Sequence, residues 1–341
     1  MFRTLYYEAV RILVRTWGTF SPESLAGILA LMRGLGDSDQ LGGRRSQYLG
    51  HLARIFPGAG PSWRRSVMRA YWLTHQRAML GLYDAARLDR AGLDSRISWG
   101  GRELLDEALA QGRGVLLLAP HFGDERTMHI LLAIAGYPMH VISTAYEGQA
   151  EAKRRARLET SMRWHHVAFP GDNPRWMFQA LGNGEVIQIA PTAWGGPRGI
   201  WVRSFGVPVL ASSAPARLHA ATGCRTLFAC CRALPGLRWR VELEDFRACS
   251  DPVRSTQDLF DRITLLGREA PGQYNWMNLA IRHRETNTLI RLGAVPADEH
   301  EVERLALRAD GDPLRIGGHR DLPPAMGISV DLTGEGEGPT R

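Results

Sequence analysis

Apolar residues recur every three to four positions through the first third of the chain, and this spacing predicts helices. In residues 1–17 an apolar stripe runs beside arginines, and Ser21-Pro22 supplies the cap and the first-turn proline of a second helix. Two more helices are predicted around residues 48–56 and 63–83, separated by the turn-forming sequence PGAGPS. The N-terminal third is therefore predicted to be helical.

From residue 102 onward short apolar runs alternate with helical segments. The run GVLLLA suits a buried strand, and residues 125–135 suit a helix. Further strands are predicted at MHVIST, VAFP, EVIQIA, GVPVLAS, TLFACCRAL and LRWRVELEDF, and further helices at 102–111, 152–164, 176–181 and ARLHAAT. This succession predicts an α/β fold, a mostly parallel central sheet flanked by helices, with an N-terminal helical region. We place the N-terminal region at 1–98, the α/β core at 99–285 and a partly loose extension at 286–341.

The first 34 residues have two interpretations. Their amphipathic helices either cover the core, as most such helices do, or lie in a membrane interface with arginines at the headgroups. The sequence alone leaves both open.

Composition narrows the classes of partner and compartment. The net charge of +7 favours acidic partners: an anionic lipid surface, an acidic carrier protein, a phosphorylated substrate or nucleic acid. The four cysteines lack paired spacing and suggest reduced thiols in a reducing compartment. Neither a signal peptide nor an apolar run of about 18 residues is found, so we expect a cytoplasmic location.

His121 is the residue whose position suggests chemistry. It follows a predicted buried strand, at the end where α/β sheets bind ligands, and Gly123 would let a substrate approach the backbone. Either Asp124 or Glu125 is close enough to orient the imidazole as a general base. In the alternative interpretation Asp124 caps the helix, Glu125 complements its dipole and His121 merely packs.

Four stretches of the chain resemble one known family. The segment GRGVLLLAPHFGDER is similar to the HxxxxD/E catalytic segment of the lauroyl and myristoyl acyltransferases of lipid A biosynthesis and of the related phosphatidylinositol mannoside acyltransferases. Three other segments resemble blocks of the same family in the same order, namely RRSQYLGHLARIFPGAGPSWRRSVMRAYW, GGPRGIWVRSFGVPVLASSAPARLHAATG and EAPGQYNWMN. The resemblance spans about residues 2–285 and implies a glycerolipid-acyltransferase-like fold.

The resemblance implies transfer of an acyl group from an acyl-carrier-protein or coenzyme A thioester to a hydroxyl or amine, without a resident cofactor. It makes His121 the general base. It also implies an acyl carrier protein as partner and a peripheral position on the inner face of the cytoplasmic membrane. With this implication, the membrane interpretation of the first helices and the core-covering interpretation carry equal weight. Nucleic acid is not expected as a partner.

The polar positions depart from the family pattern. The acidic residue five positions after the histidine is replaced by Arg126, so Asp124 or Glu125 would have to take its role. A second acidic position falls near Ala190-Pro191-Thr192. We therefore expect an acceptor other than ordinary lipid A, such as a specialised-metabolite intermediate. The rival hypothesis is a non-catalytic lipid- or carrier-binding relative, in which Arg126 fills the cleft.

The remaining candidates each have an ordinary alternative. Gly195 and Arg198 either bind a phosphate or pantetheine arm or form a tight turn. Trp276 and Asn278 either line an acyl pocket or belong to the core. The arginines at 154, 155 and 157 either dock an acidic carrier protein or form a solvated helix face. Histidines 129, 165, 166 and 219 lack ligand spacing, so no metal is expected.

Overall fold

The structure, a computed structural model of the 341-residue chain, describes residues 21–36, 45–85, 88–143, 163–166, 175–191, 199–276, 280–282 and 289–291. The helices are α2 (Pro22–Gly36), α3 (Arg45–Ile55), α4 (Pro61–Ala85), α5 (Arg90–Asp94), α6 (Arg102–Ala110), α7 (Glu125–Ile134), α9 (Arg175–Gly182), α10 (Ala214–Thr222) and α11 (Pro252–Glu269). The strands are β1 (Ile97–Gly100), β2 (Val115–Leu118), β3 (Met139–Ser143), β4 (Arg163–His166), β5 (Val186–Ile189), β6 (Ile200–Ser204), β7 (Val207–Ala211), β8 (Arg225–Leu234), β9 (Arg238–Asp245), β10 (Ala280–Arg282) and β11 (Leu289–Arg291).

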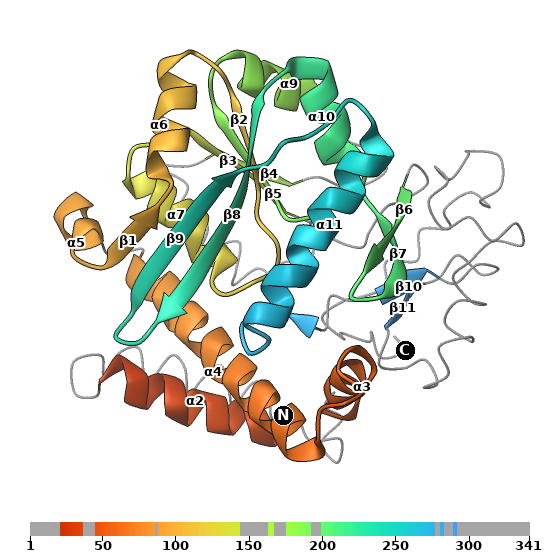
Figure 1. Ribbon diagram of the computed structural model, residues 1–341. Helices are drawn as coiled ribbons and strands as arrows, with labels where there is room; N and C mark the ends of the chain where they lie inside the picture. The colour runs from red at the N-terminus through yellow and green to blue at the C-terminus, as the bar shows by residue number, and fades with distance from the viewer. Residues whose placement is uncertain are drawn as a thin grey trace, which may run out of the picture.

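A seven-stranded sheet in the order β1-β9-β8-β2-β5-β3-β4 forms the centre of the described structure (Figure 1). Its neighbouring strands are parallel except for β8 and β9, which form an antiparallel hairpin. Strand β2 lies between β8 and β5. The predicted α/β fold with a mostly parallel sheet is therefore confirmed.

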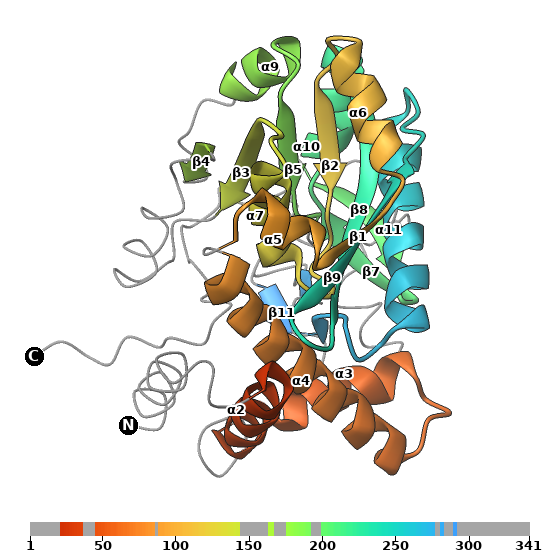
Figure 2. The ribbon, with the colours of Figure 1, turned by 90° about the vertical axis from the view of Figure 1, so that its left-hand side faces the viewer.

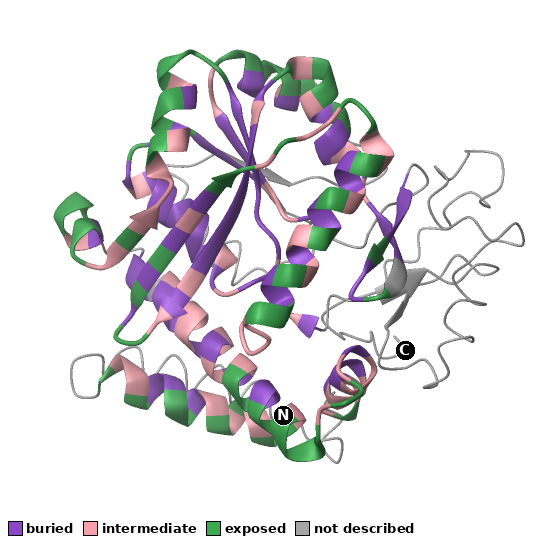
Figure 3. Cartoon of the chain, in the orientation of Figure 1, coloured by how far each residue is buried: buried purple, intermediate pink, exposed green. Residues whose placement is uncertain are grey.

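The alternating side chains of β2 explain why helices cover both faces of the sheet. Leu116 and Leu118 contribute to one hydrophobic cluster, and Val115 and Leu117 contribute to the other. All four are buried, as expected for a strand covered on both sides. Figure 3 shows the same arrangement, with a buried sheet and helices that expose only their outer faces.

The two clusters divide the helices into two layers, which are separated by the sheet in Figure 2. The helices α9, α10 and α11 bury apolar residues in the cluster of Leu116, and α2, α5, α6 and α7 do so in the cluster of Leu117. Helix α4 contributes to both, through Met68 and Trp72 at one end and Leu80 at the other. The apolar core is thus continuous across the predicted boundary at residue 98, whose position stays a prediction.

Helix α2 packs on α4 with one face and exposes the other. Leu25 and Leu29 are fully buried, whereas Ile28, Leu31 and Leu35 on the solvent side are 42%, 69% and 58% exposed. The spacing of these three residues places them on one stripe of the helix. In the described part of the chain, no helix is long and apolar enough to cross a membrane. Residues 1–17, the other amphipathic segment, lie outside the described residues.

Two local predictions were wrong. Residues 163 and 164 were assigned to the end of a helix, but they belong to β4, which pairs with β3. GVPVLAS was expected to extend the central alternation, but β7 pairs with β6 in a separate antiparallel hairpin. The two strands are joined by Phe205 and Gly206, both with positive φ. Positive φ is unusual for a phenylalanine, so the hairpin turn carries little sequence signal.

Candidate active site

His121 lies just past the end of β2, at the carboxyl edge of the parallel strands. Ala119 and Pro120 continue from the buried strand, and α7 begins four residues after the histidine, at Glu125. Proline ends the strand because it has no amide hydrogen to donate to a ladder. The position agrees with the general location of ligand sites in open α/β sheets.

The backbone around His121 is held by the closing block and by β8. The Asn275 amide donates to the His121 carbonyl oxygen at 3.0 Å, and the Gly123 amide donates to the Gln273 carbonyl oxygen at 2.8 Å. On the other side, Gly123 has a φ of 61° and lies so close to β8 that an added Cβ would stand 2.0 Å from the Cys231 carbonyl oxygen. Only glycine fits this position. The loop carrying His121 is therefore fixed by segments distant in the sequence.

Glu125 is the acid that contacts the imidazole. Its Oε1 lies 3.0 Å from Nδ1 of His121, and the two side chains are 18% and 28% exposed. Burial by itself would raise the pKa of the Glu125 carboxyl, but the hydrogen bond and charge of His121, with the charge of Arg126, hold that pKa below its ordinary value. A carboxylate that accepts from Nδ1 fixes the tautomer in which Nε2 carries the free lone pair.

Asp124 lies in the protein interior and does not take part in this contact. Its Oδ1 accepts from the amide and the hydroxyl of Thr127, at 3.1 and 2.7 Å, as the N-cap of α7. Its Oδ2 accepts from the indole Nε1 of Trp239 on β9 at 2.8 Å. Burial raises the pKa of Asp124 to about 7, against the lowering effect of the hydrogen bonds. Its geometry is that of a structural cap that ties α7 to β9.

Arg126 directly follows Glu125 in the first turn of α7, and the charges of both residues act on His75 of α4. The Arg126 side chain is exposed and has no hydrogen bond or ion pair within the described residues. His75, on α4, has its pKa lowered to about 4 by burial and then by the charges of Arg126 and Arg33. The sequence analysis did not identify His75, because helical spacing carries no information about which distant helix a side chain will meet.

Gln188 of β5 is a second residue that the sequence analysis missed. Its register partner on β2 is Leu117, and its Nε2 donates to the Glu125 carbonyl oxygen at 3.4 Å, a long contact. The side chain is buried, and its Oε1 has no hydrogen-bond partner within the described part of the chain. Gln188 is the polar residue in the otherwise apolar strand VIQI, and its side-chain amide is buried. This polar interruption is the feature of the sequence that could have identified it.

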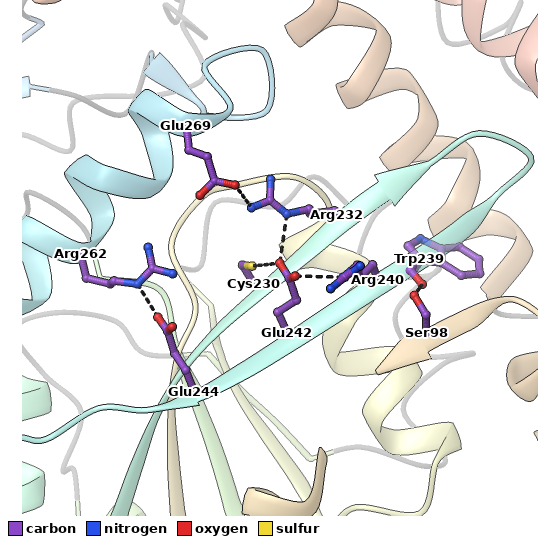
Figure 4. Close-up of polar contacts among 9 residues, drawn as sticks. All are labelled: Ser98, Cys230, Arg232, Trp239, Arg240, Glu242, Glu244, Arg262 and Glu269. Carbon is purple, nitrogen blue, oxygen red and sulfur yellow. Dashed lines mark hydrogen bonds and ion pairs between the residues drawn. The ribbon is translucent and has the colours of Figure 1, made fainter. Parts of the chain in front are cut away.

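An ionic network lies on the β8–β9 hairpin and extends to α11 (Figure 4). The guanidinium of Arg232 donates to Glu242 at 3.0 Å and to Glu269 of α11 at 2.8 Å. Its Cζ also lies 5.1 Å from the centre of the Phe122 ring, a cation–π distance. Because Phe122 directly follows His121, the network holds the loop between β8 and α11.

Trp276 is fully buried and is a core residue in the described structure. Its Nε1 donates to the Pro271 carbonyl oxygen at 2.8 Å, and its ring packs edge-on against Phe56 and Phe205. The interpretation of Trp276 as part of the core is therefore the one that this geometry supports. Gly195, Arg198 and Asn278 lie outside the described residues, as do the arginines at 154, 155 and 157.

The weaker candidates have ordinary surroundings. Cys230 and Cys231 are buried, and burial raises the pKa of both thiols, which makes them poor nucleophiles. His219 is hydrogen-bonded through Nδ1 to the Cys224 carbonyl oxygen and the Thr226 hydroxyl. No group of His, Cys, Asp and Glu suited to a metal ion occurs among the residues that the structure describes.

Comparison with known proteins assigns the chain to a family. A comparison with curated proteins finds no match. The family model of bacterial lipid A biosynthesis acyltransferases matches residues 9–282, which include the N-terminal helices, the sheet and the loop of His121. The match covers most of the 341 residues. The chain belongs to the bacterial lipid A biosynthesis acyltransferase family.

Proposed function

We propose that the protein moves an acyl group from an acyl-carrier-protein or coenzyme A thioester to a hydroxyl or amine of a lipid or specialised-metabolite acceptor, with His121 as general base. The family supports the acyltransferase class. The observation that supports the base is the 3.0 Å contact between Nδ1 of His121 and Glu125 at the carboxyl end of β2. The contact joins a base to an acid that orients it. This arrangement is expected of an enzyme that activates a hydroxyl or amine for attack.

In the proposed reaction Nε2 of His121 removes the proton from the acceptor hydroxyl or amine. The acceptor oxygen or nitrogen attacks the thioester carbonyl carbon, and a tetrahedral adduct forms. The C–S bond then breaks, and the leaving thiolate takes the proton from the imidazolium. Glu125 keeps Nδ1 protonated throughout and stabilises the transient positive charge. No acyl-enzyme and no resident cofactor are needed.

The competing hypothesis is a non-catalytic lipid- or carrier-binding relative. It predicts that the Arg126 side chain covers His121, or that the imidazole lacks an acid. The paired Glu125 and the exposed side chain of Arg126 favour the catalytic hypothesis. In this proposal Glu125 takes the role of the acid that the family pattern has at position 126, and its contact with Nδ1 of His121 supports that assignment.

The function is tested by mass spectrometry of products. Purified full-length protein is incubated with acyl thioesters on carrier protein or coenzyme A and with small-molecule and lipid extracts of its own cell. We expect an acceptor whose mass increases by one acyl group, together with free thiol, in a reaction that His121→Ala slows by at least about 10²-fold. An acylated product formed equally by the His121→Ala variant would contradict the proposal.

We further propose that α2 lies on an anionic membrane surface. The stripe of Ile28, Leu31 and Leu35 is apolar and exposed, and the net charge of +7 favours such a surface. An interfacial helix places a stripe of this kind at the boundary between headgroups and acyl chains, which would bring the enzyme to a lipid acceptor.

The double variant Leu31→Glu/Leu35→Glu is expected to weaken binding to vesicles of phosphatidylglycerol and phosphatidylethanolamine by at least about tenfold, because each leucine loses its burial in lipid. Co-sedimentation measures the binding. The control is Leu265→Glu, which changes a leucine on α11 that is 63% exposed. Equal binding of the double variant and the wild type would refute the membrane contact of α2.

A further inference from the structure

The loop that carries His121 is held by backbone hydrogen bonds from two separate segments. On one side, the Asp124 amide donates to the Cys231 carbonyl oxygen of β8 at 2.7 Å. On the other side, the Asn275 amide of the closing block, residues 271–276, donates to the His121 carbonyl oxygen at 3.0 Å. The position of the imidazole therefore depends on how β8 and the closing block are placed relative to each other.

Arg232 is the side chain that joins these two segments. It directly follows Cys231 in β8, and its Nη2 donates to Glu269, the last residue of α11, at 2.8 Å. The closing block begins two residues after Glu269, so this contact fixes its start beside β8. A second hydrogen bond, from Nε to Glu242 of β9 at 3.0 Å, fixes the plane of the guanidinium between the two carboxylates (Figure 4).

The guanidinium of Arg232 also lies against the loop itself. Its Cζ is 5.1 Å from the centre of the ring of Phe122, the residue after His121. That ring is buried, and the backbone of Phe122 forms an antiparallel bridge with Tyr274 of the closing block. A cation over the face of a buried ring is attracted to it more strongly than at an exposed site. Arg232 thus restrains the residue next to the catalytic imidazole.

We propose that Arg232 is a positioning residue for His121. By holding the loop and the start of the closing block, it keeps Nδ1 of the imidazole on Oε1 of Glu125. This inference rests on the proposed function, in which that contact orients the general base.

The magnitudes place the effect of Arg232 in catalysis rather than in folding. The two carboxylates that pair with it are 33% and 61% exposed, and ion pairs of this kind contribute little to stability. A displacement of about 1 Å at a catalytic group, in contrast, lowers a rate by up to about 10²-fold.

Arg262→Gln is a matched control for Arg232→Gln. Arg262 of α11 also pairs with a carboxylate of β9, that of Glu244, and its Cζ also lies 5.1 Å from the centre of a phenylalanine ring. That ring belongs to Phe228, which lies within β8 and not in the loop of His121. Both variants lose a guanidinium, a pairing with β9 and a cation–π contact, but only Arg232→Gln loses a contact with the loop.

Steady-state kinetics with a thioester donor and chemical denaturation of the same preparations compare the variants. Arg232→Gln is expected to lower kcat by at least about tenfold with KM unchanged, whereas Arg262→Gln keeps the wild-type kcat. The two variants should have similar denaturation midpoints. Arg232→Lys, which keeps the charge but not the planar fork, should recover part of the loss. Equal losses of kcat in Arg232→Gln and Arg262→Gln would overturn the proposal.

A double-variant cycle shows whether Arg232 acts through the pair of His121 and Glu125. In a Glu125→Gln background, Arg232→Gln should change kcat by less than about twofold, because the contact that it maintains is already lost. The full loss of about tenfold in that background would mean that Arg232 acts elsewhere, and the proposal would be rejected.

Nitrogen-15 NMR of the histidine side chains tests the positioning without turnover. At a pH where the imidazole is neutral, His121 is expected as the Nδ1–H tautomer in the wild type and in Arg262→Gln, and as a mixture of tautomers in Arg232→Gln. His121→Ala assigns the signals. The same tautomer in Arg232→Gln as in the wild type would overturn the proposal. The expected change, in a protein whose wild type transfers no acyl group, would support the positioning role and reject the proposed function alone.

Discussion

Replacement of His121 by alanine is expected to lower kcat for acyl transfer by about 10²- to 10⁴-fold, the usual contribution of a positioned general base. The variant keeps its fold, because the imidazole is 28% exposed and its side-chain hydrogen bond within the described part of the chain is the one with Glu125. Partly exposed pairs of this kind contribute up to about 1 kcal/mol to the free energy of unfolding. Initial rates with a thioester donor and chemical denaturation of the same preparation give both quantities.

A change of Glu125, the acid partner, tests whether the orientation of His121 matters for catalysis. Glu125→Gln keeps the size of the side chain but removes the negative charge that favours the Nδ1–H tautomer and the imidazolium, so kcat should fall with little change in KM. Thr127→Ser, which keeps a hydroxyl beside Asp124 in the same first turn of α7, serves as the control for disturbance of the helix start. A Glu125→Gln variant with the wild-type kcat would show that Glu125 has no part in orienting His121.

Much of this site follows from local sequence. GVLLLA followed by Pro120 and His121 predicts a strand end with a histidine at the sheet edge, and α7 was placed correctly because its apolar periodicity starts at residue 125. Local sequence could not decide between Asp124 and Glu125, since one caps and the other begins the same helix. The choice depends on Trp239, a residue of β9 whose indole donates to Asp124.

Residues brought in by tertiary packing were not predictable from one sequence. His75 is one of many polar residues on α4, and only the packing of α4 on α7 brings it within electrostatic reach of Arg126. Gln188 interrupts an apolar strand, a signal that is weak because strands often carry one polar residue. The hairpin of β6 and β7 was missed for a backbone reason, the positive φ of Phe205.

The second large effect concerns Asp124 and stability. Asp124→Ala is expected to lower the free energy of unfolding by about 3 kcal/mol, because α7 loses its N-cap, worth about 1 kcal/mol, and the buried indole N–H of Trp239 loses its acceptor, worth about 1–3 kcal/mol. The control is Asp251→Ala, which removes the exposed N-cap of α11 and should cost only about 1 kcal/mol. Urea denaturation of the three proteins gives the comparison. Equal losses in the two variants would mean that the indole contact contributes nothing.

The raised pKa of Asp124 adds a dependence on pH whose sign is opposite to that of a surface carboxylate. The unfolded chain releases the proton near the ordinary pKa of 3.8, whereas the folded protein keeps it until about pH 7. Between these values the folded state binds more protons, so this group makes stability fall as pH rises from about 4 to about 7, with no further change above. Asp124→Ala removes the group, and its loss of stability relative to the wild type should therefore be largest near pH 4 and smaller at pH 8.

Denaturation curves that shift in parallel across this range would show that Asp124 is ionised in the folded protein throughout. In that case the hydrogen bonds from Thr127 and Trp239, which favour the carboxylate, outweigh its burial.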